Sequence, residues 1–302
     1  MPDIKTIGFI GIGNMGRPMA ANLAKSGYAV VVYDLDGKRA QQAAKDIGAK
    51  AAATLAELGK QADAVITMLP TGKEVRACLF EAEGGALANS LPKGALIIDM
   101  SSSDPVGSRA THADLAKRGL AFVDAPVSGG VPRATDGSLA IMIGGDAAAV
   151  EAAKPVLAKM GKRLFAVGGP GNGHAMKALN NFVAGTAFIA VSEALLAGQK
   201  FGLDPAAMVD VMDASSGHSF CTEHVAKQHV VSRQFASGFA LGLMAKDVGI
   251  AAGLAKAIGA DSPLIGLSSA LFDEARDKVG AEKDHTLAYT YWERRDKKAA
   301  AE

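Results

Sequence analysis

Cysteine is scarce in this chain of 302 residues, and neither sign of charge is in excess. Two cysteines, Cys78 and Cys221, are too few for a disulfide framework and too distant for a local metal knuckle, so a reducing, cytoplasmic location is expected. Lysine plus arginine number 32 and aspartate plus glutamate 31, for a formal net charge of +1. Nucleic acid and anionic membranes both require a concentrated basic face, so neither is predicted as a partner.

Long hydrophobic runs are also missing. The longest uncharged apolar stretch, residues 178–192, is shorter than the roughly 18 residues of a membrane span and contains two asparagines, so no span is predicted. Glycines 8, 11 and 13 interrupt the first apolar stretch, which is unlike the core of a secretory signal. With 49% hydrophobic and 21% charged residues, the chain has the composition of a folded protein, and its length favours two domains.

The pattern of secondary structure changes near residue 167. Before it, β-rich runs alternate with helical stretches, which predicts an α/β domain over residues 1–167 with a doubly wound, parallel sheet covered on both faces. After it no strand pattern occurs, so residues 168–302 are expected to form an all-helical domain for substrate binding and oligomerisation. The expected strands are 6–10, 29–33, 64–69, 95–99, 121–123, 139–143 and 164–167; the expected helices of the second domain are 173–201, one opening at 205, 239–258 and 263–280.

A glycine-rich turn follows the first expected strand and opens a helix. In this context a GxGxxG sequence predicts a dinucleotide site, because its glycines permit a tight turn, close approach of a pyrophosphate and close packing of the helix on the sheet. The helix N-terminus then faces the phosphates. The first domain is therefore expected to be a Rossmann-type domain that binds NAD, with contacts from Gly11, Gly13, Asn14, Met15 and Gly16.

Asp34 ends the second expected strand, where a carboxylate can accept hydrogen bonds from the adenosine ribose hydroxyls. The same carboxylate repels a 2′-phosphate, and the next residue is Leu35 instead of an arginine. NAD is therefore expected in preference to NADP.

Ser128, Gly129 and Gly130 come just after the expected strand at 121–123. A hydroxyl followed by two glycine amides can form a small anion site suited to a carboxylate. Serine and glycine are also common in ordinary turns, and the residues alone leave both interpretations open.

Lys177 and Asn181 are four residues apart in the long expected helix, so they share one face of it. Burial among apolar neighbours lowers the pKa of a lysine amine toward values suited to proton transfer, although a lysine can also extend to solvent. Lys246 and Asp247 form another charged pair, which could equally lie on a solvated helix face.

Histidines and cysteines do not form a metal-binding pattern. The spacing of His218, Cys221, His224 and His229 spreads them around a helix, and no carboxylate completes the set, so no metal is expected. The remaining histidines, His112, His174 and His285, are expected to be surface or hydrogen-bonding residues.

In their order along residues 9–284, these motifs resemble those of the β-hydroxyacid dehydrogenases. This family includes 3-hydroxyisobutyrate dehydrogenase, tartronate semialdehyde reductase and the succinic semialdehyde (glyoxylate) reductases. The resemblance implies that Lys177 is the catalytic general acid/base, that Asn181 positions it or the substrate, and that Ser128 to Gly130 bind the carboxylate of a small substrate. It also implies cofactor contacts from Met68, Leu69, Pro70, Ser102, Lys246 and Asp247.

The implied function is NAD-dependent interconversion of a short 3-hydroxy acid, such as 3-hydroxyisobutyrate, and its semialdehyde. Reduction of tartronate semialdehyde, glyoxylate or succinic semialdehyde is the alternative within the family. A non-catalytic dinucleotide-binding interaction module is a rival of another class, and the presence of Lys177 counts against it and against the related imine reductases. The long apolar helices of the second domain predict a homodimer or homotetramer.

Overall fold

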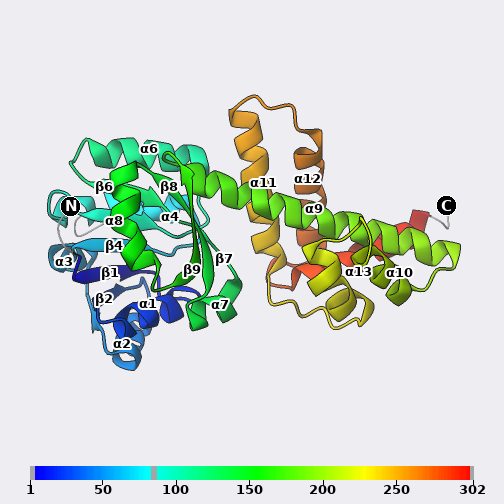
Figure 1. Cartoon of the computed structure of the whole chain (residues 1–302), viewed down its shortest axis with the longest axis horizontal. Helices are drawn as coiled ribbons and strands as arrows, with labels where there is room; N and C mark the ends of the chain where they lie inside the picture. The colour runs from blue at the N-terminus through cyan, green and yellow to red at the C-terminus, as the bar shows by residue number, and fades with distance from the viewer. Residues whose placement is uncertain (1–3, 83–86, 300–302) are drawn as a thin grey trace. The chain divides into compact units, whose positions relative to one another are not determined.

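The computed structural model describes residues 4–82 and 87–299 (Figure 1). The chain divides into two compact units, residues 1–177 and 178–302. The division falls within the long helix α9 (Asn172–Phe201), ten residues after the boundary expected at residue 167. The chain therefore changes from strands and helices to helices alone about ten residues before the point where its packing divides into two units.

The described part of the first unit contains a nine-stranded sheet with the order β3-β2-β1-β4-β5-β6-β8-β7, in which β9 also pairs with β8. All pairs from β3 to β6 are parallel, as expected. Strand β8 runs antiparallel to β6 and β7, which the sequence did not indicate. The strands are β1 (Thr6–Ile10), β2 (Ala29–Tyr33), β3 (Lys50–Ala51), β4 (Ala64–Thr67), β5 (Leu96–Asp99), β6 (Ala121–Asp124), β7 (Val127–Ser128), β8 (Leu139–Gly145) and β9 (Gly161–Gly168).

Helices cover both faces of this sheet because its strands are apolar on both sides (Figure 1). Val30 and Val32 of β2 face one core, while Val31 faces the other. One core contains α1 (Gly16–Lys25), α2 (Gly37–Ile47), α7 (Gly130–Asp136) and α8 (Ala147–Leu157); the other contains α3 (Leu55–Gln61), α4 (Gly72–Arg76), the π-turn η1 (Ala77–Glu81), α5 (Leu87–Ser90) and α6 (Pro105–Ala116). The expected Rossmann-type α/β fold is confirmed.

Among the described residues of the second unit the regular elements are all helices, apart from one isolated bridge between Ala240 and Asp284. Its core gathers large side chains such as Phe188, Phe272 and Trp292. The elements are the remainder of α9, α10 (Pro205–Asp213), the π-helix η2 (Thr222–Val231), α11 (Leu241–Ala257), α12 (Pro263–Val279), the short 3₁₀ helix η3 (His285–Leu287) and α13 (Ala288–Ala299). The sequence did not indicate the π form of η2, because a π-helix departs from the 3.6-residue period on which helix recognition depends.

Within the described residues, α9 alone has the length and apolar composition that would suit a membrane span. Half of its most apolar window is buried inside the structure. One helix of this kind is weak evidence for a membrane span.

Candidate active site

The glycine-rich turn between β1 and α1 has the geometry that a dinucleotide phosphate requires. Gly11 has φ of +93°, donates its N–H to Tyr33 O at 2.9 Å, and has no room for a Cβ against Met68 O. A Cβ on Gly16 would overlap the carbonyl of Gly11, whereas Gly13 is exposed, with nothing within 4 Å of the position of a Cβ. Gly11 and Gly16 thus shape the turn, and Gly13 leaves its outer side open to a ligand.

Asn14 and Met15 complete this turn. Asn14 is exposed and Met15 is partly exposed, immediately before the first residue of α1. Their backbone therefore lies at the helix N-terminus, where N–H groups lack partners within the helix and attract anions.

Asp34, just after β2, is tied to the same turn. Its Oδ2 accepts a hydrogen bond from Ile12 N at 2.9 Å, and its Oδ1 accepts one from Asp36 N at 3.0 Å. Arg39 on α2 lies 3.5 Å from Oδ1, with its side chain 53% exposed. An arginine therefore does stand beside the carboxylate, at position 39 on α2 and not at position 35, where one was expected to be needed.

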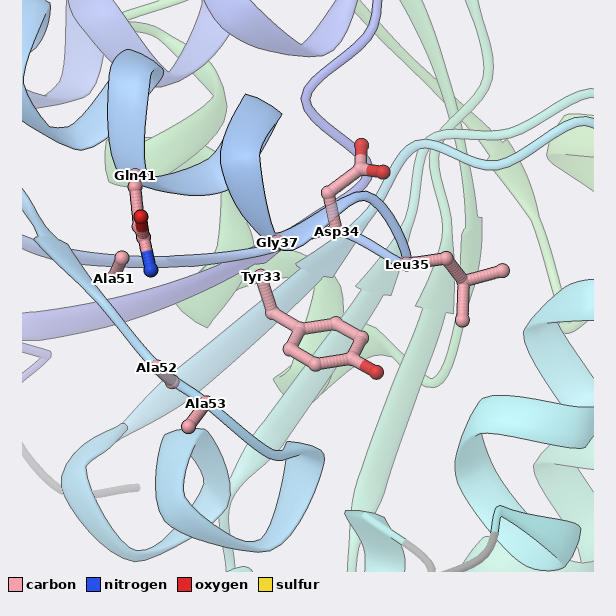
Figure 2. Close-up of a pocket in the computed structure, with 8 residues that line it drawn as sticks. All are labelled: Tyr33, Asp34, Leu35, Gly37, Gln41, Ala51, Ala52 and Ala53. Carbon is pink, nitrogen blue, oxygen red and sulfur yellow. The ribbon is translucent and has the colours of Figure 1, made fainter.

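A cavity of about 190 Å³ adjoins Asp34 (Figure 2). Tyr33 and Asp34 come from the end of β2, Gln41 from α2, and the other wall from the chain at and after β3. Most of the exposed lining is polar, and with a carboxylate at its side it suits the adenosine ribose of a dinucleotide. The lining residues are Tyr33, Asp34, Leu35, Gly37, Gln41, Ala51, Ala52 and Ala53.

The cofactor-side loops expected at residues 68–70 and 102 are joined by a hydrogen bond. Leu69 donates its N–H to Ser101 Oγ at 2.9 Å. Ser101 and Ser103 are buried, whereas Ser102 between them is partly exposed. Of these three serines, Ser102 is thus the one whose hydroxyl a ligand can reach.

The segment Ser128 to Gly130 lies at the margin of the sheet. Ser128 ends β7 and pairs with Ala140 of β8. Gly129 and Gly130 have φ of +133° and +63°, and a Cβ on Gly129 would crowd Arg133. Glycine is needed at both positions for conformational reasons, and all three residues are partly or fully exposed. Binding of a carboxylate here stays a prediction.

Three of the remaining predicted residues come together in the second unit. Asn181 of α9 donates from Nδ2 to Asp247 Oδ2 at 2.6 Å, and Lys246 Nζ lies 3.6 Å from Asp247 Oδ1. Asp247 is buried, so its side chain holds Asn181 in place, a contact the sequence did not reveal. Lys177, one turn before Asn181, is partly buried and is the last residue of the first unit.

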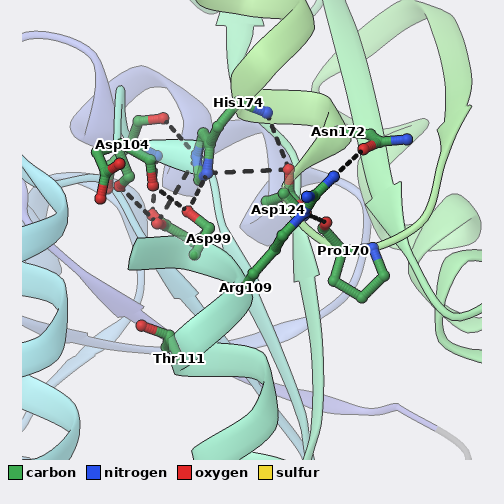
Figure 3. Close-up of polar contacts among 12 residues, drawn as sticks. Asp99, Asp104, Arg109, Thr111, Asp124, Pro170, Asn172 and His174 are labelled. Atoms are coloured by element: carbon green, nitrogen blue, oxygen red, sulfur yellow. Dashed lines mark hydrogen bonds and ion pairs between the residues drawn. The ribbon is translucent and has the colours of Figure 1, made fainter. Parts of the chain in front are cut away.

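Sequence reasoning missed a buried polar cluster at the ends of β5 and β6 (Figure 3). Asp124 accepts hydrogen bonds from Gly171 N at 2.8 Å and His174 N at 2.9 Å, so it holds the start of α9. His174 is 1% exposed, which corrects the surface alternative and bears out the hydrogen-bonding one. The available signal was an aspartate at the carboxyl end of each of two successive strands, Asp99 and Asp124.

The part of the chain that the structure describes contains no group of three or more histidine, cysteine, aspartate or glutamate side chains placed to hold a metal ion. His218 contacts Asp213 and Glu223 instead.

A Rossmann-type unit with this glycine turn and ribose-side carboxylate, followed by a helical unit, defines the class of nicotinamide-dinucleotide oxidoreductases. A model of the NAD-binding domain of 6-phosphogluconate dehydrogenase matches residues 6–169. A second model, for NAD binding by NADP-dependent 3-hydroxyisobutyrate dehydrogenase, matches residues 171–292.

Named relatives agree with these matches. The 3-hydroxyisobutyrate dehydrogenase of Pseudomonas aeruginosa is 40% identical over 272 residues, which cover 88% of this chain and 90% of the relative. The NAD-dependent L-serine dehydrogenase of Pseudomonas aeruginosa is 37% identical over 294 residues, covering 94% and 96%. The solved structure of Mycobacterium tuberculosis 3-hydroxyisobutyrate dehydrogenase with L-serine has a TM-score of 0.88 at 33% identity, covering 96% and 99%.

The chain belongs to the β-hydroxyacid dehydrogenase family. It is a dehydrogenase that acts on the hydroxyl group of hydroxy acids and binds NAD or NADP. The family, the fold class and the enzyme class expected from the sequence are thereby confirmed.

Proposed function

We propose that this enzyme oxidises a short 3-hydroxy acid, with 3-hydroxyisobutyrate as the first candidate, to its semialdehyde, with Lys177 as the general acid/base. The observation that carries the proposal is the fixed amide of Asn181 one turn after Lys177 on α9, held by the buried Asp247. An amide fixed in this way can hold a substrate hydroxyl in line with the lysine amine. The name of the relative that is 40% identical supports this substrate.

In the proposed reaction the neutral amine of Lys177 accepts the hydroxyl proton, and in the reverse direction its ammonium returns that proton. NAD, when bound, accepts the hydride. Asp247 takes one N–H of Asn181, and the carboxamide oxygen of Asn181 accepts from Asn180 Nδ2 at 3.1 Å. We assign the second N–H of Asn181 to the substrate hydroxyl. Ser128 and the Gly129 and Gly130 amides would hold the carboxylate.

L-Serine is the second candidate substrate, because it too is a 3-hydroxy acid and because a relative 37% identical is named for it. Tartronate semialdehyde, glyoxylate and succinic semialdehyde remain the alternatives for the reductive direction. All of these compounds carry the carboxylate that the proposal requires.

We propose NAD as the preferred cofactor. Asp34, whose side chain is 10% exposed, is well placed to accept from ribose hydroxyls and to repel a 2′-phosphate. Arg39 moderates this preference because its guanidinium is near enough to attract the same phosphate. The contact of Lys246 with the nicotinamide end stays a prediction.

We further propose that the enzyme is a cytoplasmic homodimer or homotetramer. Large apolar side chains on the second unit are exposed, among them Val183 at 63%, Phe201 at 86%, Val211 at 64% and Ile258 at 63%. Such exposure suits a self-association surface. Both cysteines are free, as suits a reducing compartment. Light scattering on the protein as it elutes from a size-exclusion column measures the oligomeric state. A purely monomeric solution would contradict the proposed homodimer or homotetramer.

The substrate proposal is tested by absorbance at 340 nm with NAD and a panel of 3-hydroxyisobutyrate, L-serine, the carboxamide of 3-hydroxyisobutyrate and a simple primary alcohol. NADH with glyoxylate, tartronate semialdehyde and succinic semialdehyde tests the reverse direction. We expect the highest kcat/KM for 3-hydroxyisobutyrate and little turnover without a carboxylate. Equal turnover of the carboxamide or the alcohol would remove the carboxylate-binding role from Ser128 to Gly130.

A further inference from the structure

His174, in the first turn of α9, connects two segments of the first unit through its imidazole ring (Figure 3). Nε2 lies 3.1 Å from the carbonyl oxygen of Ser101, and Nδ1 lies 2.7 Å from Ser108 Oγ. Ser101 follows β5, whereas Ser108 lies in the first turn of α6. The ring is fully buried, so both contacts are shielded from water.

The Ser101 contact defines which ring nitrogen donates. A carbonyl oxygen can only accept, so Nε2 carries a hydrogen and donates it to Ser101 O. Nδ1 makes the second hydrogen bond, to the Ser108 hydroxyl, which itself donates to Asp104 O at 2.9 Å. The ring also lies between two buried carboxylates, with Nε2 3.7 Å from Asp99 Oδ2 and Nδ1 3.8 Å from Asp124 Oδ2. Its orientation is thus determined from several sides.

The segment that His174 contacts through Ser101 is itself fixed by hydrogen bonds. Asp99 accepts from Ser101 N at 3.0 Å and from Ser103 Oγ at 2.8 Å. Ser101 Oγ accepts from Leu69 N. The Ser101–Ser103 loop, which contains Ser102, is therefore held in place by these hydrogen bonds, and a side chain that bonds to it is held in turn.

The other end of the connection is the backbone of α9. Besides the bonds of Asp124 to Gly171 N and His174 N, Arg109 donates from Nε to Pro170 O at 3.1 Å and from a terminal nitrogen to Asn172 Oδ1 at 3.2 Å. Lys177 follows His174 by three residues, so one turn of helix transmits the position of His174 to Lys177.

We propose that His174 is a positioning residue for the reaction: by bonding Ser101 and Ser108, it fixes the first turn of α9 and so sets where Lys177 presents its amine relative to Ser102. The inference rests on the proposed role of Lys177. This positioning role differs from a purely structural one, in which His174 would only fill space in the core and any buried side chain of similar size could replace it.

His174→Leu separates these two roles because leucine keeps much of the volume and removes both hydrogen bonds. We expect kcat to fall by about 10²-fold, since displacement of a reacting group by about 1 Å has that effect, with little change in the Kd of NADH. His174→Gln should restore most of kcat, because its amide N–H can reach Ser101 O. His112→Leu on α6 is the matched control and should keep wild-type activity. Wild-type kcat in His174→Leu would overturn the proposal.

Amide hydrogen exchange gives a readout that needs no substrate. In His174→Leu, exchange at residues 174–178 should be faster by about tenfold or more, while exchange at residues 185–200 of the same helix stays unchanged. Should that variant fail to fold, Ser108→Ala, which removes only the hydroxyl, replaces it in both measurements. Unchanged amide exchange together with unchanged kcat would overturn the proposal. If exchange is altered but the wild-type enzyme oxidises no hydroxy acid, the proposed function is wrong, while the role of His174 in fixing the first turn of α9 still holds.

Discussion

Asn181 and Asp247 are joined by a hydrogen bond of 2.6 Å between two helices of the second unit, with exposed fractions of 8% and 4%. Within the described residues Asp247 Oδ1 has no hydrogen-bond partner, although Lys246 Nζ lies 3.6 Å away. The bond to Asn181 is thus the main directional contact of this carboxylate, and it determines which way the Asn181 amide faces.

Asp247→Ala should lower kcat more than it changes the Kd of NADH, because Asn181 loses the group that orients it. It should also lower the free energy of unfolding by about 1–3 kcal/mol, since a buried N–H loses its acceptor. Asp247→Asn keeps an oxygen at the same place and should be milder in both respects. Steady-state kinetics and urea unfolding measure the two effects; kcat unchanged in Asp247→Ala would show that the orientation of Asn181 does not matter.

Lys177→Ala should lower kcat by about 10²-fold or more, as expected for loss of a general acid/base. Its affinity for NADH should remain, because the glycine turn and Asp34 are unchanged. Lys200→Ala removes another lysine from α9, one that pairs with Asp296 at 2.8 Å, and should leave kcat unaltered. A Lys177→Ala enzyme with near wild-type turnover would assign the proton transfer to another group.

Asp34→Asn should shift preference toward NADP, because Arg39, at 3.5 Å, is then available to a 2′-phosphate. We expect NADPH binding to improve by about tenfold, or 1.4 kcal/mol, and to improve further with Leu35→Arg. Calorimetric Kd values for NADH and NADPH measure the shift. Arg39→Ala added to Asp34→Asn should cancel the gain; if the gain persists, Arg39 is not the partner. Equal kcat/KM for both cofactors in the wild type would contradict the NAD preference.

Asp284 should contribute stability that depends on pH. Burial alone would raise the pKa of this carboxyl, but hydrogen bonds from Thr286, Ser237 and Gly238 outweigh burial and hold the pKa below its ordinary value of 3.8. The stabilisation is therefore present above the unfolded-state pKa and is lost as pH falls through the lower folded-state pKa.

Asp284→Asn should accordingly lower the free energy of unfolding at neutral pH by about 1.5–3 kcal/mol, the usual value of hydrogen bonds to a charged group. The deficit should shrink as the pH is taken below about 4, where the unfolded wild-type carboxyl takes up a proton. Urea unfolding across that range measures it, with the exposed Asp277→Asn as control. A deficit independent of pH would mean that the charge of Asp284 contributes nothing.

The sequence was sufficient for features that depend on neighbouring residues. The turn at Gly11 to Gly16 could be predicted because strand, turn and helix follow one another, and the buried strands because their apolar runs are continuous. Strands β3 and β7, with two residues each, are too short to produce such a pattern. The antiparallel direction of β8 depends on how the chain returns after β7, which composition does not specify.

Features that depend on how the chain packs in three dimensions could not be predicted. Arg39 lies only five residues after Asp34, but its contact with that carboxylate depends on how α2 follows β2, which the residue types do not specify. His174 and Asp124 are 50 residues apart, and nothing in the sequence marks them as a pair. Likewise Ser102 cannot be distinguished from Ser101 and Ser103 until the fold buries its two neighbours.

Because Asp124 holds the start of α9, it also determines where chimaeras between this enzyme and its relatives can be joined. A fragment ended at residue 167 would remove both N–H donors of a fully buried carboxylate, as well as Gly173, where any Cβ would crowd the carbonyl oxygens of Asp124 and Met142 at 2.6 Å. Chimaeras that exchange the helical unit should therefore be joined within α9, after residue 177, so that the donor contributes the helix only from Ala178 onward.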